Sequence, residues 1–515
     1  MFDNKLLIVM SKKLFVCACL LFIGAGVIMR FAFLFVPYEY DELFTAVTAN
    51  PALPLSWIWT HWLLVDVHPP LHNVLLWGYH HVAPYGPEVW LRLPSVVCGL
   101  AAVALGWCMF PRRFGKTARW LFMALLAGNF YAIFYSQHAR AYALMLALSV
   151  PLTFLFLQIS LLLRKGRAVP RKLWLWWGVL LVLLGWSHYF GMLFFGITSG
   201  LLAVQALHSR KNIAWALLLP CVVFACFLPW LVPNLLYNVG QNRFGGNWWA
   251  DETPGVFVWS GLVSFFFAYT VAFLVLGVLV LSGWVWNYED FKRKRRFPFE
   301  RELLLLLALL VGVFGFVGLL YFKIYLWFGR YFIEIMPALF LFVALSAARV
   351  VRHSWVAKLI FVVYLGMIGV QTAANWRLIV YSHYFSSRIS AQFYRDHAPE
   401  KELFVIALEA FPPQTLEPMY GFYPNQVYHM DARVTELYHL DEAARDEALK
   451  RREKALIWMP NCDIVKLSRV SKEWNRAIAL EGKLGSSCFL QLSDKNVEAD
   501  PAWKKRKLNW EDLAH

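Results

Sequence analysis

Charged residues are scarce in this sequence. Only 16% of its 515 residues are charged and 59% are hydrophobic, whereas soluble domains have about a quarter and about a half of these classes. This composition excludes an ordinary soluble protein and predicts a chain that needs lipid as its solvent. Apolar stretches that are typical of membrane helices include Leu14 to Val36, Val89 to Phe110, Trp174 to Trp186, Val271 to Trp286, Leu303 to Phe322 and Ala338 to Ala348.

Acidic residues are also outnumbered, and the net charge is +16. From Arg377 onward, however, 20 basic and 20 acidic residues cancel. The whole excess therefore belongs to the apolar part, where cytoplasmic loops and anionic headgroups account for it. A nucleic-acid partner has no support, whereas membrane lipid is an expected partner.

Several chemical signatures are missing. Gly115-Lys116-Thr117 resembles the end of a phosphate-binding loop, but Phe110 stands at the required upstream glycine. The sequence contains no metalloprotease helix motif, no serine hydrolase elbow and no internal repeat of the transporter kind. Nucleotide chemistry is therefore not expected.

Cysteines are few, and none has the spacing of a zinc site. Six lie in apolar segments, where a small buried hydrophobe is the expected role. Cys462 and Cys488 are the two in the hydrophilic C-terminal part. If that part lies in an oxidising compartment, we predict a disulfide between them.

The distribution of basic residues predicts the topology. Loops rich in Lys and Arg stay in the cytoplasm, and they alternate here with loops that carry little positive charge. This alternation predicts about 11 transmembrane helices with a cytoplasmic N-terminus, in a cytoplasmic (inner) membrane. The loops expected outside are Pro37 to Pro87, Tyr135 to Tyr142, Ser187 to Gly191, Pro233 to Gly255 and Lys323 to Tyr331.

The apolar pattern ends near Trp376, which divides the chain into a membrane domain, 1–376, and an outer or periplasmic domain, 377–515. Leu403 to Ala407, Ala455 to Met459 and Cys488 to Leu492 read as short buried strands, and Leu440 to Lys454 reads as a helix. The predicted fold class is a polytopic α-helical membrane protein with a small C-terminal α/β soluble domain.

Charged and histidine side chains are costly near hydrocarbon, so those gathered on the outer side are candidates for a site. Three carboxylates follow the first apolar stretch, in Tyr38-Glu39-Tyr40-Asp41-Glu42. One alternative is that they complement the N-terminal dipole of a second helix. The other is that one of them is a partly desolvated general base.

The segment Asp66-Val67-His68-Pro69-Pro70-Leu71-His72 is the second candidate. Two prolines can open a helix, which leaves His68 beside its first turn. His68 could cap this helix, bind a phosphate oxygen, or bind a divalent metal ion with Asp66 and His72.

Basic and aromatic residues in later outer loops complete the set. Arg140 and Arg330 oppose the positive-inside trend, and either phosphate binding or headgroup contact would explain them. We also expect an intrahelical pair of Arg330 with Glu334. His188, Trp248 and Trp249 lie where an interfacial aromatic belt or stacking on a sugar ring would place them.

Taken in order, several motifs resemble the bacterial branch of the protein O-mannosyltransferase-like glycosyltransferases, of the GT-C class. The aminoarabinose transferase that modifies lipid A is a related architecture. The motifs that carry the resemblance are Tyr40-Asp41-Glu42, His68-Pro69-Pro70-Leu71, Leu91-Arg92-Leu93-Pro94-Ser95, Tyr135-Ser136-Gln137 with Arg140-Ala141-Tyr142, Ser187-His188-Tyr189-Phe190-Gly191 and Gly329-Arg330-Tyr331.

The resemblance implies an enzyme that transfers a sugar from a polyprenyl-phosphate carrier, with inversion, to an acceptor outside the cytoplasmic membrane. The acceptor could be lipid A or another glycolipid, a glycan or a protein. By resemblance, Asp41 is the base and Glu42 orients it or the acceptor. His68, Arg140, His188 and Arg330 bind the donor phosphate, while Tyr40, Asp66, Trp248 and Trp249 contact the acceptor or sugar.

Val67 stands where aminoarabinose transferases tend to have Glu, which argues against a metal site like theirs. Two other functions would also need a polytopic bundle with polar groups. One is a lipid-linked sugar flippase or transporter. The other is a glycan polymerase or ligase with a pyrophosphate-linked donor.

Overall fold

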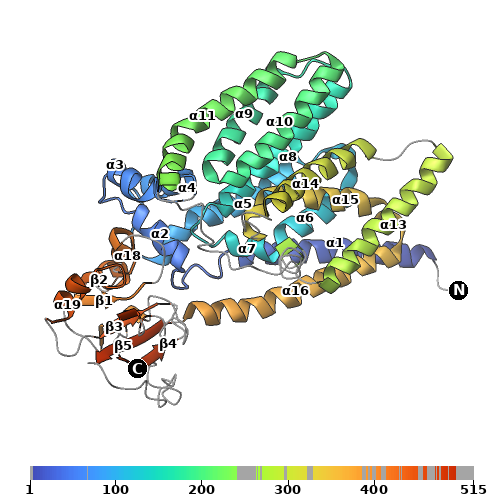
Figure 1. The fold of residues 1–515 in the computed structure, drawn as a ribbon. Coiled ribbons are helices and arrows are strands. Elements are labelled where there is room, and N and C mark those ends of the chain that lie inside the picture. The colour runs from blue at the N-terminus through green and yellow to red at the C-terminus, as the bar shows by residue number, and fades with distance from the viewer. Residues whose placement is uncertain are drawn as a thin grey trace. The chain divides into compact units, whose positions relative to one another are not determined.

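The chain forms two compact units in a computed structural model (Figure 1). Unit 1 comprises Met1–Leu34, Leu63–Leu76 and Arg92–Asn375, and unit 2 comprises Phe35–Trp62, Trp77–Leu91 and Trp376–His515. The structure describes residues 4–66, 68–240, 263, 265–266, 270–294, 299–321, 329–384, 390–392, 395–396, 402–407, 413–420, 422–427, 430, 432–450, 456–460, 470, 473–474, 477–484 and 487–493.

Long apolar helices make up unit 1 (Figure 1). Within the described residues, nine helical segments are long and apolar enough to cross a membrane, and α6 and α9 are shorter. The polytopic helical fold predicted from the apolar stretches is therefore confirmed. The long helices are α1 (Asn4–Met29), α5 (Glu88–Met109), α6 (Gly115–Gly128), α8 (Tyr142–Arg164), α9 (Arg171–Ser187), α10 (Tyr189–Ser209), α11 (Ile213–Gly240), α13 (Thr270–Lys294), α14 (Glu300–Tyr321), α15 (Met336–His353) and α16 (Trp355–Tyr384).

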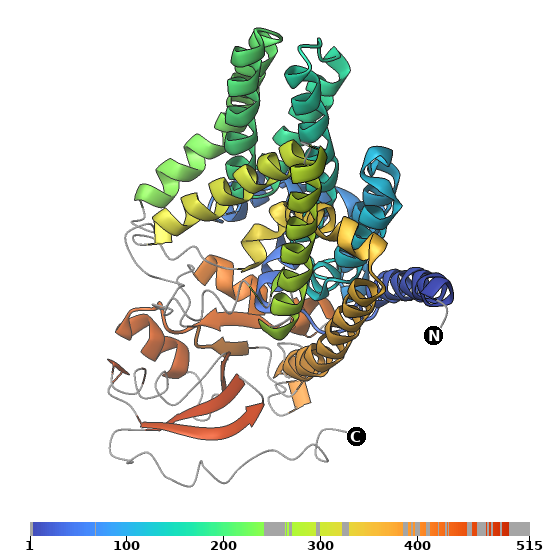
Figure 2. The same cartoon turned by 90° about the vertical axis from the view of Figure 1, so that its right-hand side faces the viewer.

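Two helices form the centre of unit 1. The share of buried residues is 83% for the span at Tyr142–Arg164 and 89% for the span at Gly329–His353, against 17% to 44% for the other candidate spans. Helix α15 packs on α6, α8, α13 and α14, while α8 also packs on α9 and α10. The green helices α9 to α11 remain together when the molecule is turned (Figure 2). Peripheral helices therefore expose apolar side chains, as lipid contact requires.

The first helix ends earlier than the sequence predicted. The apolar stretch reaches Val36, but α1 ends at Met29 and turns follow. Buried polar side chains form hydrogen bonds with the backbone N–H and C=O groups of this segment. Arg92 Nη1 donates to Phe33 O at 2.8 Å. Gln137 Nε2 donates to Met29 O at 2.8 Å, and Gln137 Oε1 accepts from Phe33 N. Because these bonds satisfy the backbone without a helix, the chain can leave the helical path.

Short helices connect the membrane helices. They include η2 (Arg112–Phe114), α7 (Phe130–Tyr135) and the 3-10 helix η3 (Gly329–Ile335) in unit 1. The α2 (Tyr40–Thr48), α3 (Leu55–Ile58) and η1 (Trp59–Leu63) segments follow the turns after α1, and α4 (Leu71–Tyr79) follows the paired prolines. Pro69 and Pro70 precede α4 directly, in agreement with the expectation that they open a helix.

A five-stranded sheet forms the core of the C-terminal part of unit 2. The strand order is β2-β1-β3-β5-β4, in which β2, β1 and β3 are parallel and β5 is antiparallel to β3 and β4. The red strands β4 and β5 lie side by side in Figure 2. The elements are β1 (Glu402–Val405), α18 (Pro413–Tyr420), the π-helix η4 (Phe422–Val427), β2 (Arg433–Glu436), α19 (Glu442–Lys450), β3 (Ile457–Met459), β4 (Ala477–Leu484) and β5 (Ser487–Ser493).

The three predicted strands and the predicted helix correspond to β1, β3, β5 and α19, so the predicted C-terminal α/β fold is confirmed. The edge strands β2 and β4 were not predicted. Strand β2 has no continuous apolar run, and the apolar run of β4 covers only residues 477–480 of its eight, because an edge strand needs less apolar surface than a central strand.

Unit 2 also contains two segments that the sequence assigned to the membrane domain 1–376. These segments, 35–62 and 77–91, group with the C-terminal part. Helix α2 packs on α18 and η4, which provides the physical reason. The two segments hold to each other as well, since Trp77 Nε1 donates to Leu53 O at 3.0 Å and the Tyr85 hydroxyl donates to Ala46 O at 2.9 Å.

Candidate functional site

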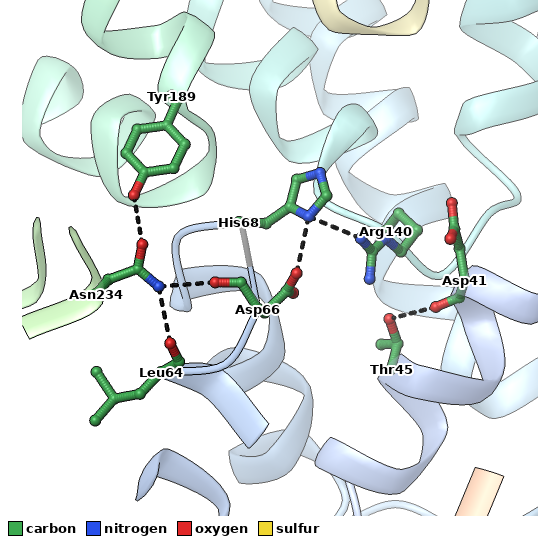
Figure 3. Close-up of polar contacts among 8 residues, drawn as sticks. All are labelled: Asp41, Thr45, Leu64, Asp66, His68, Arg140, Tyr189 and Asn234. Atoms are coloured by element: carbon green, nitrogen blue, oxygen red, sulfur yellow. Dashed lines mark hydrogen bonds and ion pairs between the residues drawn. The ribbon is translucent and has the colours of Figure 1, made fainter. Parts of the chain in front are cut away.

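A buried polar cluster in unit 1 centres on His68. Its Nδ1 atom lies 3.0 Å from Asp66 Oδ1 and 3.2 Å from Arg140 Nη2 (Figure 3). Asp66 and Arg140 are both buried, and the His68 side chain is 18% exposed. Residues 72 positions apart in the chain thus come together, as the predicted donor-phosphate set requires for His68 and Arg140.

The charge of Asp66 decides which contact is the hydrogen bond. Burial by itself raises the pKa of Asp66, but His68 and Arg140 outweigh burial and hold that pKa below its usual value. An ionised carboxylate only accepts, so His68 Nδ1 must carry the proton and donate to Asp66. Arg140 then cannot donate to the same nitrogen, and its attraction is to the charge of Asp66. His68 Nε2 is left for another partner.

Asn234 fixes the backbone of this loop, and it was not among the residues predicted from the sequence. Its Nδ2 atom donates to Asp66 O at 2.7 Å and to Leu64 O at 3.0 Å, while Oδ1 accepts from the Tyr189 hydroxyl at 2.8 Å (Figure 3). Asn234 is fully buried in the apolar helix α11. An amide inside such a helix needs polar partners, which is the signal that could have identified it.

His188 is a neutral hydrogen-bond donor. It is the N-cap of α10, where its Nδ1 accepts from Phe190 N at 3.2 Å. The proton of a neutral ring must then be on Nε2, and this buried atom has no partner among the described residues. Burial, followed by His68, Arg140 and Arg330, lowers the pKa of His188 well below its usual value. The ring therefore offers one uncharged N–H in a positive environment.

The η3 segment places Tyr331 against this cluster. The Tyr331 ring centroid lies 4.9 Å from that of His188 and 6.3 Å from that of His68. Arg330 precedes it and is close enough to affect the charge of His188. The four predicted phosphate ligands, His68, Arg140, His188 and Arg330, thus belong to one region of unit 1.

The expected pair of Arg330 with Glu334 is wrong. Both Glu334 carboxylate oxygens are buried without a hydrogen-bond partner among the described residues. The physical reason is the helix type. In a 3-10 helix, side chains three apart are aligned, so a spacing of four does not bring them together.

Asp41 and Glu42 lie in the first turn of α2, in unit 2. Glu42 is fully buried, and its Oε2 accepts from Glu39 N at 3.1 Å, which caps the start of the helix. Asp41 is partly exposed, and its backbone oxygen accepts from the Thr45 hydroxyl at 3.3 Å (Figure 3). Glu42 therefore stabilises the helix start, as one of the two alternatives predicts, while Asp41 presents the more accessible carboxylate of the two.

Other predicted residues lie partly or wholly outside the described residues. Trp248, Trp249 and Cys462 are outside them, and the same holds for the side chain of Tyr40. Cys488 is disulfide-bonded. In the described part of the chain, no group of three or more His, Cys, Asp or Glu could hold a metal ion.

This combination of a many-helix unit and a small α/β unit is a fold that the chain shares with a solved structure of ArnT. The structure of ArnT from Cupriavidus metallidurans in the apo state matches with a TM-score of 0.55 and 14% sequence identity, over 92% of this chain and 97% of that chain. The same protein bound to undecaprenyl phosphate matches with a TM-score of 0.54 and 13% identity, over the same shares. No protein-family model matches the chain, and a search of curated proteins also found no match.

Proposed function

We propose that this protein is a glycosyltransferase that moves a sugar from a polyprenyl-phosphate carrier to an acceptor. The GT-C fold supports the class, because a structure of this fold, ArnT, was determined with undecaprenyl phosphate bound. In this proposal, His68, Arg140, His188 and Arg330 bind the donor phosphate, and Asp41 is the base.

The observation that carries the proposal is the buried, unpartnered Nε2–H of His188. A buried N–H without an acceptor costs about 1–3 kcal/mol, so a protein keeps one where a ligand supplies the acceptor. His68, Arg140 and Arg330 all disfavour a positive charge on His188. The same positive environment favours an anion, and a phosphate oxygen is an acceptor that carries negative charge.

The residues divide the chemistry between leaving group and nucleophile. The acceptor hydroxyl oxygen attacks the anomeric carbon while the bond from that carbon to the phosphate oxygen breaks. Negative charge grows on the phosphate, where arginine and the imidazole N–H stabilise it. Asp41 takes the proton of the hydroxyl, and the products are the glycosylated acceptor and free polyprenyl phosphate. Attack from the face opposite the phosphate inverts the anomeric carbon.

The remaining parts of the proposal concern location. The alternation of basic loops supports an inner-membrane protein with a cytoplasmic N-terminus and a periplasmic unit 2. The bond of Cys488 supports an oxidising compartment for that unit. The acceptor in this proposal is a glycolipid such as lipid A, another glycan or a protein.

Purified protein in lipid, incubated with a panel of radiolabelled polyprenyl-phosphate sugars and membrane extract, tests the function. We expect transfer from one donor, and loss of transfer to background in Asp41→Asn. The matched control is Asp446→Asn, a half-buried aspartate of α19 outside the proposed site, which should transfer at the wild-type rate.

The failure of every donor would contradict the proposal. If one donor then crossed the bilayer without transfer, a flippase would be favoured, and use of a pyrophosphate-linked donor would favour a polymerase or ligase. A well-folded and fully active Asp41→Asn variant would remove Asp41 from the mechanism while leaving the enzyme class intact.

A further inference from the structure

A buried hydrogen-bond relay holds the chain just before Asp41. Tyr38 lies three residues ahead of Asp41, and its backbone N–H donates to the Tyr423 hydroxyl oxygen at 2.6 Å. The same hydroxyl donates to Glu88 Oε1 at 3.0 Å. The Tyr38 hydroxyl donates to Gly86 O at 3.3 Å. One phenol oxygen therefore accepts one bond and donates another, which uses the ability of a hydroxyl to do both.

Aromatic packing surrounds this relay. The ring centroid of Tyr38 lies 5.6 Å from that of Phe422 and 5.9 Å from that of Tyr423, and Phe422 also meets Tyr85 at 6.0 Å. Tyr38 and Tyr423 are each only 1% exposed. Water therefore cannot replace the phenol oxygen easily, and the bonds are worth more than at a surface.

The relay joins segments that are distant in the chain. Tyr423 belongs to η4, which follows α18 in the C-terminal part, and Tyr38 is 385 residues earlier. Helix α2, which carries Asp41, packs on both α18 and η4. Glu88 is the first residue of α5. All three partners belong to unit 2, so the relay lies within one compact unit.

We propose that Tyr423 is a positioning residue that ties the Asp41 segment to the C-terminal domain through Tyr38 and Glu88. The domain then determines where Asp41 stands, and an acceptor bound to the domain would be held in register with Asp41. The role in transfer rests on the proposed function, whereas the mechanical tie does not.

Hydrogen–deuterium exchange tests the tie without any assay of activity. Tyr423→Phe keeps the ring and removes the oxygen, so the Tyr38 amide loses its acceptor. We expect the peptide over residues 35–46 to exchange about tenfold faster in this variant, with the helices of unit 1 unchanged. Unchanged exchange of this peptide would overturn the tie, whatever the activity.

Tyr438→Phe is a matched control. The Tyr438 hydroxyl donates to Glu473 Oε2 at the same distance, 3.0 Å, but on an exposed surface of the C-terminal domain. It should leave exchange at 35–46 unchanged. An equal effect of both variants would mean general loosening of the domain and would overturn the specific tie.

Kinetics test the positioning role. Donor affinity should stay within about twofold of the wild type in Tyr423→Phe, while turnover should fall about tenfold, because only the position of the base changes. Glu88→Gln keeps an acceptor for the phenol and should retain most turnover, whereas Glu88→Ala should resemble Tyr423→Phe. Equal losses of donor affinity and turnover in Tyr423→Phe would contradict a positioning role.

The outcomes separate the two proposals. A wild-type protein that transfers no sugar refutes the proposed function, and exchange at residues 35–46 still decides the tie. An active wild type with faster exchange but normal turnover in Tyr423→Phe supports the tie and overturns its role in transfer. If Tyr423→Phe does not accumulate, Glu88→Ala tests the tie with the phenol in place: the Tyr423 hydroxyl loses the carboxylate that orients it, so exchange at residues 35–46 should rise, though by less than in Tyr423→Phe.

Discussion

The polar residues of the two units are held by different means. In unit 1, His68 bonds to the Asp66 side chain and His188 bonds to a backbone N–H, and each ring keeps one nitrogen for another partner. In unit 2, Glu42 and Tyr423 bond to the backbone around Asp41, so that the segment itself is fixed. The first arrangement orients side chains within a rigid helical body, and the second orients a short loop.

This difference indicates a division of work. A phosphate group has oxygens in several directions, so its binding needs donors that converge from several helices. A base needs one carboxylate at one position, which a fixed loop can supply. Substitutions in the two units should therefore have distinguishable effects, on donor affinity and rate in unit 1 and on rate alone in unit 2.

Arg140 should show the largest effect within unit 1. Arg140→Ala removes a buried guanidinium from the cluster, and we expect transfer to fall about 10²–10³-fold, the usual cost of a lost donor to a developing oxyanion. Arg140→Lys keeps the charge without the planar fork and should be intermediate. Transfer rates and the Kd for undecaprenyl phosphate are the measurements.

The control for Arg140 is Arg113→Ala. Arg113 pairs with Glu302 at 3.3 Å, and its side chain is 34% exposed. Exposed pairs contribute little, so this variant should keep wild-type transfer and affinity. A normal Kd for Arg140→Ala would contradict the phosphate role. Substitutions in unit 1 would then affect the rate alone, as is expected for unit 2.

Two substitutions of His188 distinguish its role as a helix cap from its role in ligand binding. His188→Asn keeps an acceptor for Phe190 N, because asparagine is a good N-cap, but its shorter side chain lacks the reach of Nε2. We expect a normal melting temperature with about tenfold weaker binding of undecaprenyl phosphate. His188→Ala should show the weaker binding and also lose about 1 kcal/mol of stability. Wild-type affinity in His188→Asn would show that Nε2 has no ligand.

His72 should make unit 1 sensitive to acid. Burial, followed by the charge of Arg140, lowers the pKa of His72 to about 3, with Asn73 acting in the opposite direction. The folded pKa lies below the unfolded value of about 6.5, so stability is full above that value and falls as the pH drops below it. Between pH 7.5 and 5.5, His72 should account for a loss of about 1.4 kcal/mol.

Thermal unfolding at the two pH values measures this loss. His72→Gln should reduce the difference between pH 7.5 and 5.5, whereas His81→Gln, at an exposed position of unit 2, should leave it unchanged. An identical pH dependence in wild type and His72→Gln would mean that the His72 ring is not kept neutral by folding.

Much of the fold could be predicted, because apolar runs such as Leu303 to Phe322 have to be buried in lipid or protein. The end of the first helix could not. Its sequence stays nearly all apolar to Val36, and the side chains of Arg92 and Gln137, more than fifty residues later, offer bonds that replace those of the helix. Likewise, Glu334 stands at a helical spacing from Arg330, and the local 3-10 geometry separates them.

The residues of the candidate site also include some that the sequence identifies and some that it does not. His68, Arg140, His188 and Arg330 could be named from the sequence, because charge and imidazole on the outer side of apolar segments need a reason. Asn234 carried a weaker signal, an amide in an apolar helix, and Tyr423 carried none, since a tyrosine in a soluble domain has an ordinary explanation.

The sequence by itself determined which part of the chain needs lipid and which needs water as its surroundings. It also determined which chemical groups the loops predicted to lie outside can offer. Those properties depend on composition and on periodicity along the chain. Only the tertiary structure decided that His68 Nδ1 donates to Asp66, that Phe190 N donates to His188 Nδ1 and so leaves the His188 proton on Nε2, and that residues 35–62 belong with the C-terminal domain. These depend on hydrogen bonds between residues far apart in the chain, and such bonds form only when folding brings their partners together.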